Sequence, residues 1–149
     1  MVLGWCKYVL WYTILSLSSS REGTYTYRQE EGCIYSGHWV HGRRNGHGKL
    51  SFLDGSFYRG NFKDDQMHGK GIYVDATDGS QYDGEWYKNL RQGQGALIDT
   101  LGNIYNGEFW ANMRHGHGTV HNVDGSVYTG RYEGNLVKGT GVVVSLVIV

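Results

Sequence analysis

The sequence contains no proline and only two cysteines among its 149 residues, and its formal net charge is zero. Proline cannot donate a ladder hydrogen bond, so its absence fits a chain whose backbone lies mostly in β-sheet. Two cysteines, Cys6 and Cys33, are too few for a disulfide framework, which favours a reduced, cytoplasmic setting. Because fourteen basic residues balance fourteen acidic ones, the chain lacks the positive charge expected of a nucleic-acid-binding protein.

The sequence also lacks an apolar segment long enough to cross a bilayer as a helix. The run from Tyr8 to Leu17 is the main candidate, whereas a spanning helix needs about 20 residues. With Lys7 before it and Ser18 to Ser20 after it, the run has the layout of a short secretory signal, but its basic region is weak and bulky aromatics lie before and within it. Two interpretations of residues 1–22 therefore stay open, a signal or anchor and a packed or irregular extension.

A repeated motif fills most of the remaining chain. Five units begin with Tyr-x-Gly-x-aromatic, and their leading tyrosines stand 23 or 24 residues apart. Counted from this tyrosine, position +2 is always glycine, +4 is aromatic, +11 and +13 are glycine, and +15 is apolar. A fixed period of this size indicates an array built from one supersecondary unit. The leading tyrosines are Tyr35, Tyr58, Tyr82, Tyr105 and Tyr128.

The columns of the repeat predict one β-hairpin per unit. Alternation at positions 0, +2 and +4 has the period of a strand. Position +7 is Gly, Asp or Asn, the residue types that tolerate a left-handed backbone, and therefore marks a turn. A second strand should run from the Gly-x-Gly to about +16, and a second turn, most often Asp-Gly, should follow it.

The predicted fold is all-β, an elongated single-layer antiparallel meander of at least ten strands. The glycine at +2 should leave room for a neighbouring ring, so that one face carries a stack of aromatic side chains. Cross-strand aromatic pairs contribute roughly 0.2 to 1 kcal/mol each, enough to hold together a ribbon with a thin core. The ten expected rings belong to Tyr35, Trp39, Tyr58, Phe62, Tyr82, Trp86, Tyr105, Phe109, Tyr128 and Tyr132.

Tyr-x-Gly-x-aromatic, a turn, Gly-x-Gly-x-apolar and Asp-Gly-x-x-Tyr resemble the pattern of MORN (membrane occupation and recognition nexus) repeats. The match covers Tyr35 to Val143. The resemblance implies a twisted ribbon that scaffolds other proteins or approaches membranes. Arg44-Asn-Gly-His-Gly48 and Arg114-His-Gly-His-Gly118 are similar to segments of axonemal and radial-spoke MORN proteins, which implies a place in the axoneme of a cilium or flagellum.

Both ends depart from the pattern, so we divide the chain into residues 1–22, a repeat array over 23–141 and an apolar strand over 142–149. Residues 23–27 with 31–35 have the pattern of a degenerate half repeat before the five full ones. The segment 142–149 is apolar and lacks the closing turn. An apolar strand at a bare edge pairs readily with another chain. Either it meets a partner or a second copy, or the chain is a piece of a longer protein.

Charge is distributed unevenly between the two kinds of turn. The turns at +5 to +10 have a positive balance, which predicts a basic edge of Arg43, Arg44, Lys63, Lys88, Arg91, Arg114 and Lys138. The opposite turns contain no Lys or Arg and predict an acidic edge of Glu30, Glu31, Asp54, Asp75, Asp78, Asp99 and Asp124. Much of the acidic edge is also explained by Asp as the usual first residue of an Asp-Gly turn.

The residues that could indicate catalysis or a cofactor site occupy ordinary positions of the repeat. His115 and His117 alternate onto one strand face, but other units place Gln or Lys in these columns, so we expect no metal site. The Gly-x-Gly pairs enter strands and not helices, so they do not predict a phosphate site. No Ser, Cys or Lys stands out of register as a nucleophile would. We therefore expect no catalytic residue, no cofactor and no enzymatic activity.

The function that the sequence favours is a protein-interaction scaffold whose aromatic face holds a helix or an extended peptide of a partner. One alternative is a phosphoinositide or anionic-membrane module that uses the basic edge. A second alternative is the regulatory MORN segment of a larger enzyme, because the resemblance extends to MORN segments attached to lipid kinases and lysine methyltransferases. The expected location is the cytoplasm.

Overall fold

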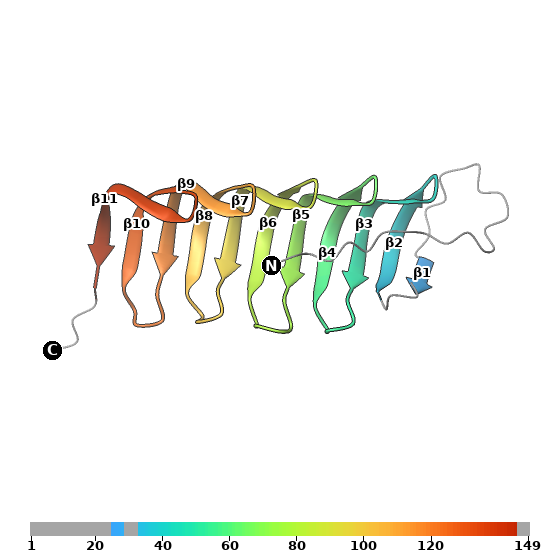
Figure 1. The fold of residues 1–149 in the computed structure, drawn as a ribbon, viewed down its shortest axis with the longest axis horizontal. Coiled ribbons are helices and arrows are strands. Elements are labelled where there is room, and N and C mark those ends of the chain that lie inside the picture. The colour runs from blue at the N-terminus through green and yellow to red at the C-terminus, as the bar shows by residue number, and fades with distance from the viewer. Residues whose placement is uncertain (1–24, 29–32, 146–149) are drawn as a thin grey trace.

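A computed structural model describes residues 25–28 and 33–145 of the chain. These residues form one antiparallel sheet of eleven strands, and the order of the strands in the sheet is their order in the sequence. Figure 1 shows an elongated ribbon whose short turns follow one long edge and whose longer loops follow the other. The strands are β1 Tyr25–Arg28, β2 Ile34–Val40, β3 Arg43–Ser51, β4 Phe57–Lys63, β5 Gln66–Val74, β6 Gln81–Tyr87, β7 Leu90–Ile98, β8 Ile104–Trp110, β9 Met113–His121, β10 Val127–Glu133 and β11 Leu136–Val144.

The all-β meander predicted from the sequence is confirmed, including its sequential order. Each full repeat is a hairpin of a seven-residue strand and a nine-residue strand. The strand β1 pairs with β2 in the place expected for the degenerate half repeat. The expectations for residues 1–22, for Glu30 and Glu31 and for the last four residues lie outside the described part of the chain.

Two-residue turns close the hairpins, and both turn residues have positive φ, as in type I′ turns. Position +7 adopts the left-handed backbone that its Gly, Asp and Asn residues predict. Position +6 also adopts the left-handed backbone, although its residue type differs between repeats. His41 and Ala111, for example, have φ angles of 49° and 47°. The sequence gives no signal for position +6, because the strands on either side impose this conformation.

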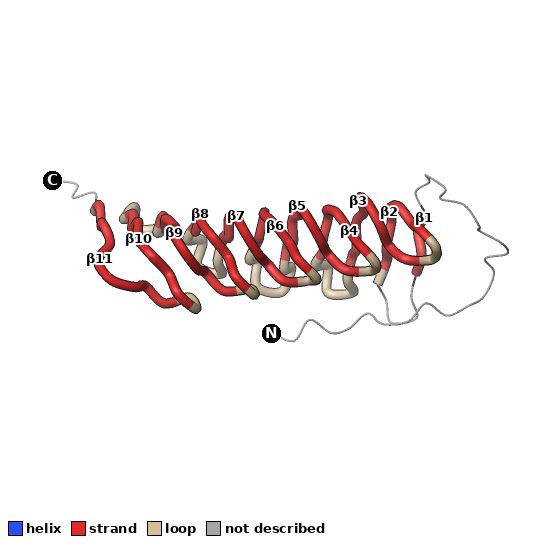
Figure 2. Tube along the Cα trace, turned by 90° about the horizontal axis from the view of Figure 1, so that it is seen from above, coloured by secondary structure: helices blue, strands red, loops and turns tan. Residues whose placement is uncertain are grey.

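The long strand of each hairpin begins earlier than predicted. We expected it to start at the Gly-x-Gly, but β7 already begins at Leu90, directly after the turn. The first glycine of the pair, Gly93, instead lies inside the strand with a φ of 72°. The pairing of β6 with β7 shifts register at this point, between Gly84 and Trp86. Such a bulge bends a strand, and Figure 2 shows the strands of the array bending in the same way from repeat to repeat.

A row of glycines crosses the sheet beneath the aromatic side chains. Gly84 pairs with Gly95 inside its hairpin and with Gly71 of the preceding hairpin. A Cβ atom added at Gly95 would lie 2.6 Å from the Tyr82 ring. The predicted space for a ring is therefore confirmed, and the ring that fills it is the tyrosine at the start of the same repeat. We call the face that carries the ten aromatic side chains the inner face and the opposite face the outer face.

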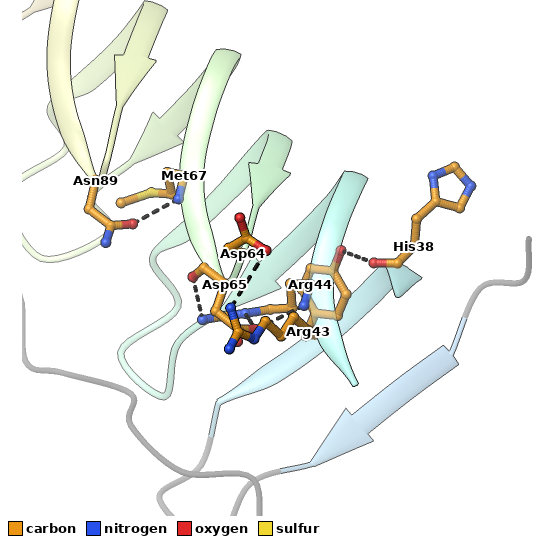
Figure 3. A network of polar contacts seen from close by, with 8 residues as sticks. His38, Arg43, Arg44, Asp64, Asp65, Met67 and Asn89 are labelled. Atoms are coloured by element: carbon orange, nitrogen blue, oxygen red, sulfur yellow. Dashed lines mark hydrogen bonds and ion pairs between the residues drawn. The ribbon is translucent and has the colours of Figure 1, made fainter. Parts of the chain in front are cut away.

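Each hairpin turn is also joined to the hairpin before it. The side-chain oxygen of Asn112 accepts a hydrogen bond of 2.8 Å from the backbone N–H of Arg91, and the N–H of Asn112 donates to the carbonyl of Arg91. Asp65 makes the same two contacts with Arg44, Asn89 with Met67, and Asn135 with Arg114. Figure 3 shows the clamps that join Asp65 to Arg44 and Asn89 to Met67. Position +7 therefore sets the turn and also fixes the spacing of repeats.

Substituting Asn112→Gly should lower the free energy of unfolding by about 1 to 2 kcal/mol. Glycine keeps the positive φ but removes the acceptor, which leaves the Arg91 N–H without its partner. Asn112→Asp keeps the acceptor and serves as the matched control, with a loss of well under 1 kcal/mol expected. Urea denaturation of the three proteins measures the difference. Equal midpoints for the Gly and Asp variants would show that the clamp contributes nothing.

Candidate interaction surfaces

The ten predicted aromatic residues form one ladder of ring contacts along the inner face. Each leading tyrosine makes an edge-to-face contact with the +4 ring of its own repeat, and the first four also make one with the +4 ring of the next repeat. The ring of Tyr82, for example, lies 5.2 Å from Trp86 and 4.9 Å from Phe109. Edge-to-face geometry is the favourable arrangement for such pairs. The ladder therefore couples all five repeats.

Most of these rings are core residues. Eight of the ten side chains are buried, and only Trp39 and Tyr128, in the first and fifth repeats, are half-buried. We expected a partner to lie along the ring row, but burial leaves little of it for direct contact. The binding role of these ten residues stays a prediction, and their role in packing is what the geometry establishes.

Four of the leading tyrosines also donate a hydrogen bond across the glycine row. The Oη atoms of Tyr35, Tyr58, Tyr82 and Tyr105 donate to the carbonyl three residues later, over 2.9 to 3.0 Å. Burial raises the pKa of Tyr35 and of Tyr105 to about 12, and it raises the pKa of Tyr58 and Tyr82 as well. The phenol groups are thus held neutral inside the ladder.

Three arginines of the predicted basic edge lie over the rings instead. The guanidinium carbon of Arg91 is 5.6 Å from the centroids of both Tyr82 and Phe109, and Arg44 and Arg114 occupy the same place in their repeats. Their Nη2 atoms donate to the carbonyl of the next turn. Burial lowers the pKa of Arg91. Through these cation-π contacts the three arginines pack over the aromatic rings of the inner face.

The basic edge is therefore smaller than the sequence suggests. Arg43 pairs with Asp64 over 3.7 Å, and Lys138 pairs with Glu133 over 3.2 Å. Lys63 and Lys88 are exposed and have no carboxylate partner within the described residues. The prediction that Arg44, Arg91 and Arg114 lie at the basic edge is wrong, because the bulge turns position +9 onto the inner face.

The predicted acidic edge consists of turn-forming aspartates. Asp54, Asp78 and Asp124 each accept a hydrogen bond from the backbone N–H two residues later, as Asp75 does from Thr77. The Thr77 hydroxyl and N–H hold the pKa of Asp75 below its usual value. Asp99 accepts from both Leu101 and Asn103. The structure thus favours the turn-forming explanation of this column.

The accessible part of the inner face lies beside the ladder. Phe52, Tyr73 and Leu97 are only partly buried and pack against the core. Two polar atoms on this face, Trp39 Nε1 and Tyr128 Oη, are buried and have no hydrogen-bond partner among the described residues. The equivalent indole of Trp86 donates to the Gly71 carbonyl over 2.9 Å. A ligand along this face would meet aromatic edges, aliphatic groups and the half-buried arginines.

The outer face carries large apolar side chains that sequence reasoning missed. Tyr87, Leu90, Trp110 and Met113 are all exposed, and they lie next to the tight turns of the third and fourth repeats. They occupy positions +5 and +8, which do not belong to the invariant columns. The signal that could have found them is an aromatic residue at +5 in two successive units.

The described residues contain no group of three His, Cys, Asp or Glu side chains placed to hold a metal ion. Within the same residues, no helix has the length and apolar character needed to cross a membrane.

Comparison with known proteins identifies the repeat. The family model for the MORN repeat matches residues 35–57, 58–80, 82–99 and 105–127, together more than half of the chain. Human alsin is 31% identical over 69 residues, which cover 44% of this chain and 4% of alsin. Protein TIC 100 of Arabidopsis thaliana is 41% identical over 46 residues, 31% of this chain and 5% of that protein. The chain thus spans a small fraction of the length of these curated relatives.

A solved structure of the SAS-4 (dCPAP) TCP domain of Drosophila melanogaster covers 93% of this chain, and the match covers 97% of that domain. Its sequence identity is 11% and its TM-score is 0.33. The two shapes differ too much at this TM-score for the likeness to support a functional argument.

Proposed function

The chain belongs to the MORN repeat family, and we propose that it is a non-enzymatic scaffold that holds a helix or an extended peptide of a partner protein on its inner face. MORN repeats are generally modules that bind proteins or membranes. The observation that carries the proposal is the half-buried inner-face row of Phe52, Tyr73 and Leu97, which flanks a rigid ring ladder. A preformed row of apolar anchors binds with little loss of side-chain freedom.

The geometry of the repeat suits an elongated ligand better than a small molecule. Tyr73 and Leu97 occupy position +15 of successive repeats, and neighbouring strands lie about 4.8 Å apart. These two anchors therefore lie about 9.6 Å apart along the ribbon, and a helix or extended segment that follows its axis would meet them in turn. The arginines over the ladder add donors for carboxylates or carbonyl groups of the partner.

The membrane alternative has less support from the described residues. Of the seven basic residues proposed for it, three cover the rings and two are paired with carboxylates, which leaves Lys63 and Lys88. A regulatory role inside a larger enzyme remains a second alternative, since the relatives are much longer than the matched segments. We place the scaffold in the cytoplasm because the sequence has only two cysteines, and in a cilium or axoneme assembly because of the recurrences at Arg44 and Arg114.

A photo-crosslinking amino acid at position 97 tests the inner-face proposal. Leu97 and Ala96 are neighbours on β7 with opposite orientations, so position 96 is the matched control on the outer face. In extracts of ciliated cells, we expect position 97 to crosslink one discrete protein segment, identified by mass spectrometry, and position 96 not to. Equal products from both positions would contradict the proposal.

Phosphoinositide vesicles provide the second arm of this experiment. If the scaffold function holds, vesicle flotation should be weak, and Lys63→Glu with Lys88→Glu should leave the position-97 crosslink intact. Strong, salt-sensitive flotation that these two substitutions abolish would favour the membrane alternative.

A further inference from the structure

The outer face has a patch that the fold does not require. We define the outer patch as Tyr87, Leu90, Trp110 and Met113. Tyr87 is opposite Leu90 across one hairpin, and Trp110 is opposite Met113 across the next. Tyr87 is 48% exposed and Trp110 is 58% exposed. Two neighbouring hairpins thus present the same aromatic and aliphatic pair to solvent.

The equivalent positions in the other repeats are mostly polar or small. The first repeat has Val40 opposite Arg43, the second has Lys63 opposite Gln66, and the fifth has Glu133 opposite Leu136. All five hairpins close with the same turn geometry. Packing of the hairpin therefore does not explain the outer patch, and large exposed apolar groups that cluster indicate a binding surface.

The spacing of the outer patch selects one ligand conformation. Tyr87 ends β6 and Trp110 ends β8, with β7 between them in the sheet, so the two anchors lie about 9.6 Å apart at a strand spacing of about 4.8 Å. A polyproline II helix advances about 3.1 Å per residue and repeats every third residue, or about 9.3 Å. A β-strand returns to the same face after roughly 6.8 Å, and an α-helix does so over about 10.5 Å in seven residues.

We propose that the outer patch binds a proline-rich, acidic segment of another protein in the polyproline II conformation, with two prolines three residues apart seated at Tyr87 and Trp110. The patch extends over two repeats, which matches a single Pro-x-x-Pro unit. Aromatic residues are the usual partners of such segments, since a flat ring packs against the rigid pyrrolidine.

Hydrogen-bond donors at the outer patch fit this conformation. The Trp110 Nε1, the Tyr87 Oη and the Gln92 amide make no hydrogen bond within the described residues. A polyproline II backbone has no internal hydrogen bonds, so its carbonyl oxygens are free to accept, whereas the carbonyls of an α-helix are already bonded. Beside Tyr87 lies a shallow hollow of about 340 Å³ lined by His68, Glu85 and Gln92. This hollow gives one proline ring a seat.

Charge around the outer patch defines the remaining chemistry of the ligand. Lys88 lies at the turn with its Nζ 5.3 Å from the centroid of the Tyr87 ring, and Lys63 occupies the equivalent edge of the preceding hairpin. Neither lysine has a carboxylate partner within the described residues. Glu85 and Glu108, at the same position of β6 and β8, are the opposing charges on the strand side. Lys63 lies on the side of Tyr87 away from Trp110, because β4 precedes β6 in the sheet. Acidic residues at and before the proline seated at Tyr87 would pair with the two lysines at the turn edge.

The ligand is not a segment of these 149 residues, because they contain no proline. The outer patch is also on the opposite face from Leu97 and its neighbours, so this proposal is independent of the inner-face function. The chain would then join two partners, one on each face of the same rigid sheet.

Binding of synthetic peptides tests the proposal directly. The probe is a short fluorescein-labelled peptide with proline at every third position and glutamate and alanine between. The control peptide has the same composition, with its prolines rearranged so that no two stand three residues apart. Fluorescence polarisation should show saturable binding of the first peptide, at least tenfold tighter than the second. Trp110→Ser should weaken binding about tenfold or more, as should Tyr87→Ser, while Leu101→Ser, at a 74% exposed position on the other edge, should leave it unchanged.

Several results would overturn the proposal. They are no saturable binding at millimolar peptide, equal binding of the two peptides, an unchanged affinity of Trp110→Ser, or tighter binding of an amphipathic helical peptide. If a variant fails to fold, amide chemical shifts of the unmodified chain decide the question. Peptide-induced changes confined to the outer patch support the proposal, and changes along Phe52, Tyr73 and Leu97 refute it. The position-97 crosslink should be intact in Trp110→Ser, so each proposal fails separately.

Discussion

Raising the pH from 10 to 12 should unfold the protein, because the tyrosines of the ladder cannot ionise in place. An unfolded tyrosine has a pKa near 10, whereas burial raises the pKa of Tyr35 and Tyr105 to about 12 and raises that of Tyr58 and Tyr82 in the same direction. Below about pH 10, both states keep these protons and stability is unaffected. Above it, the unfolded state binds fewer protons than the folded state, so the free energy of unfolding falls with pH.

The expected slope is large. Each buried tyrosine removes up to about 1.4 kcal/mol of stability per pH unit in this window, so four together remove at most roughly 5.6 kcal/mol per unit. Domains are usually stable by only about 5 to 15 kcal/mol. Urea denaturation at a series of pH values measures the slope. Tyrosinate absorbance that appears together with unfolding supports the account, and ionisation of all tyrosines near pH 10 in a protein that stays folded would contradict it.

Tyr58→Phe is the matched variant for the alkaline experiment. It removes one ionisable group and one hydrogen bond to the Asn61 carbonyl. At neutral pH we expect a loss of about 1 kcal/mol. Between pH 10 and 12 its stability should fall less steeply, by about 1.4 kcal/mol per unit. A variant with the slope of the original chain would show that Tyr58 ionises freely.

The sequence predicts the fold in detail because its period is short and its columns are nearly invariant. Tyrosine, glycine and an aromatic residue at 0, +2 and +4 predict a strand with one face of rings, and this face is what the structure shows. Asn or Asp at +7 predicts the turn. Local chemistry and tertiary packing agree at these positions, which is why reasoning from the residues succeeds there.

The misplaced features share one cause, the bulge in each long strand. A glycine with positive φ has the same sequence signature in a turn as in a bulge. The sequence predicts that the second strand starts at Gly93, which assigns Arg91 to the turn and hence to an exposed edge. In the structure Arg91 of β7 lies directly opposite Trp86 of β6 in the strand pairing, and its side chain therefore shares the inner face with Trp86. The clamp from Asn112 to Arg91 was also unpredictable, since it joins residues of different repeats.

The outer patch could not be identified as a binding surface from the sequence, because only the burial of each aromatic side chain distinguishes a core residue from an exposed one. Trp86 and Tyr87 are adjacent aromatic residues, and the period of the strand places them on opposite faces. Only the structure shows that Trp86 is buried in the ladder while Tyr87 is exposed. The exposed aromatics are the ones that a partner reaches without disturbing the core.

Substituting Gly84→Val should abolish stable folding. Valine favours strands, and propensity alone would add up to about 1 kcal/mol of stability. A Cβ at Gly84, however, would lie 2.5 Å from the Tyr82 Oη and 2.6 Å from the Gly95 Cα. The Tyr82 ring would have to leave its place, with loss of its two ring contacts and of its hydrogen bond to the Glu85 carbonyl. Overpacking costs about 1 to 3 kcal/mol, and the lost contacts add about 2 to 4 kcal/mol.

Gly125→Asn is the control for this substitution. Gly125 has a φ of 84° and no atom within 4 Å of an added Cβ, and asparagine tolerates this backbone. Its midpoint of thermal unfolding should shift by a few degrees at most, whereas Gly84→Val should lose the cooperative transition in circular dichroism. Gly84→Ala should fall between them, because alanine brings the clashing Cβ without the branch. An unchanged melting temperature for Gly84→Val would mean that Tyr82 does not lie over the glycine row, and the ladder as a continuous core would have to be abandoned.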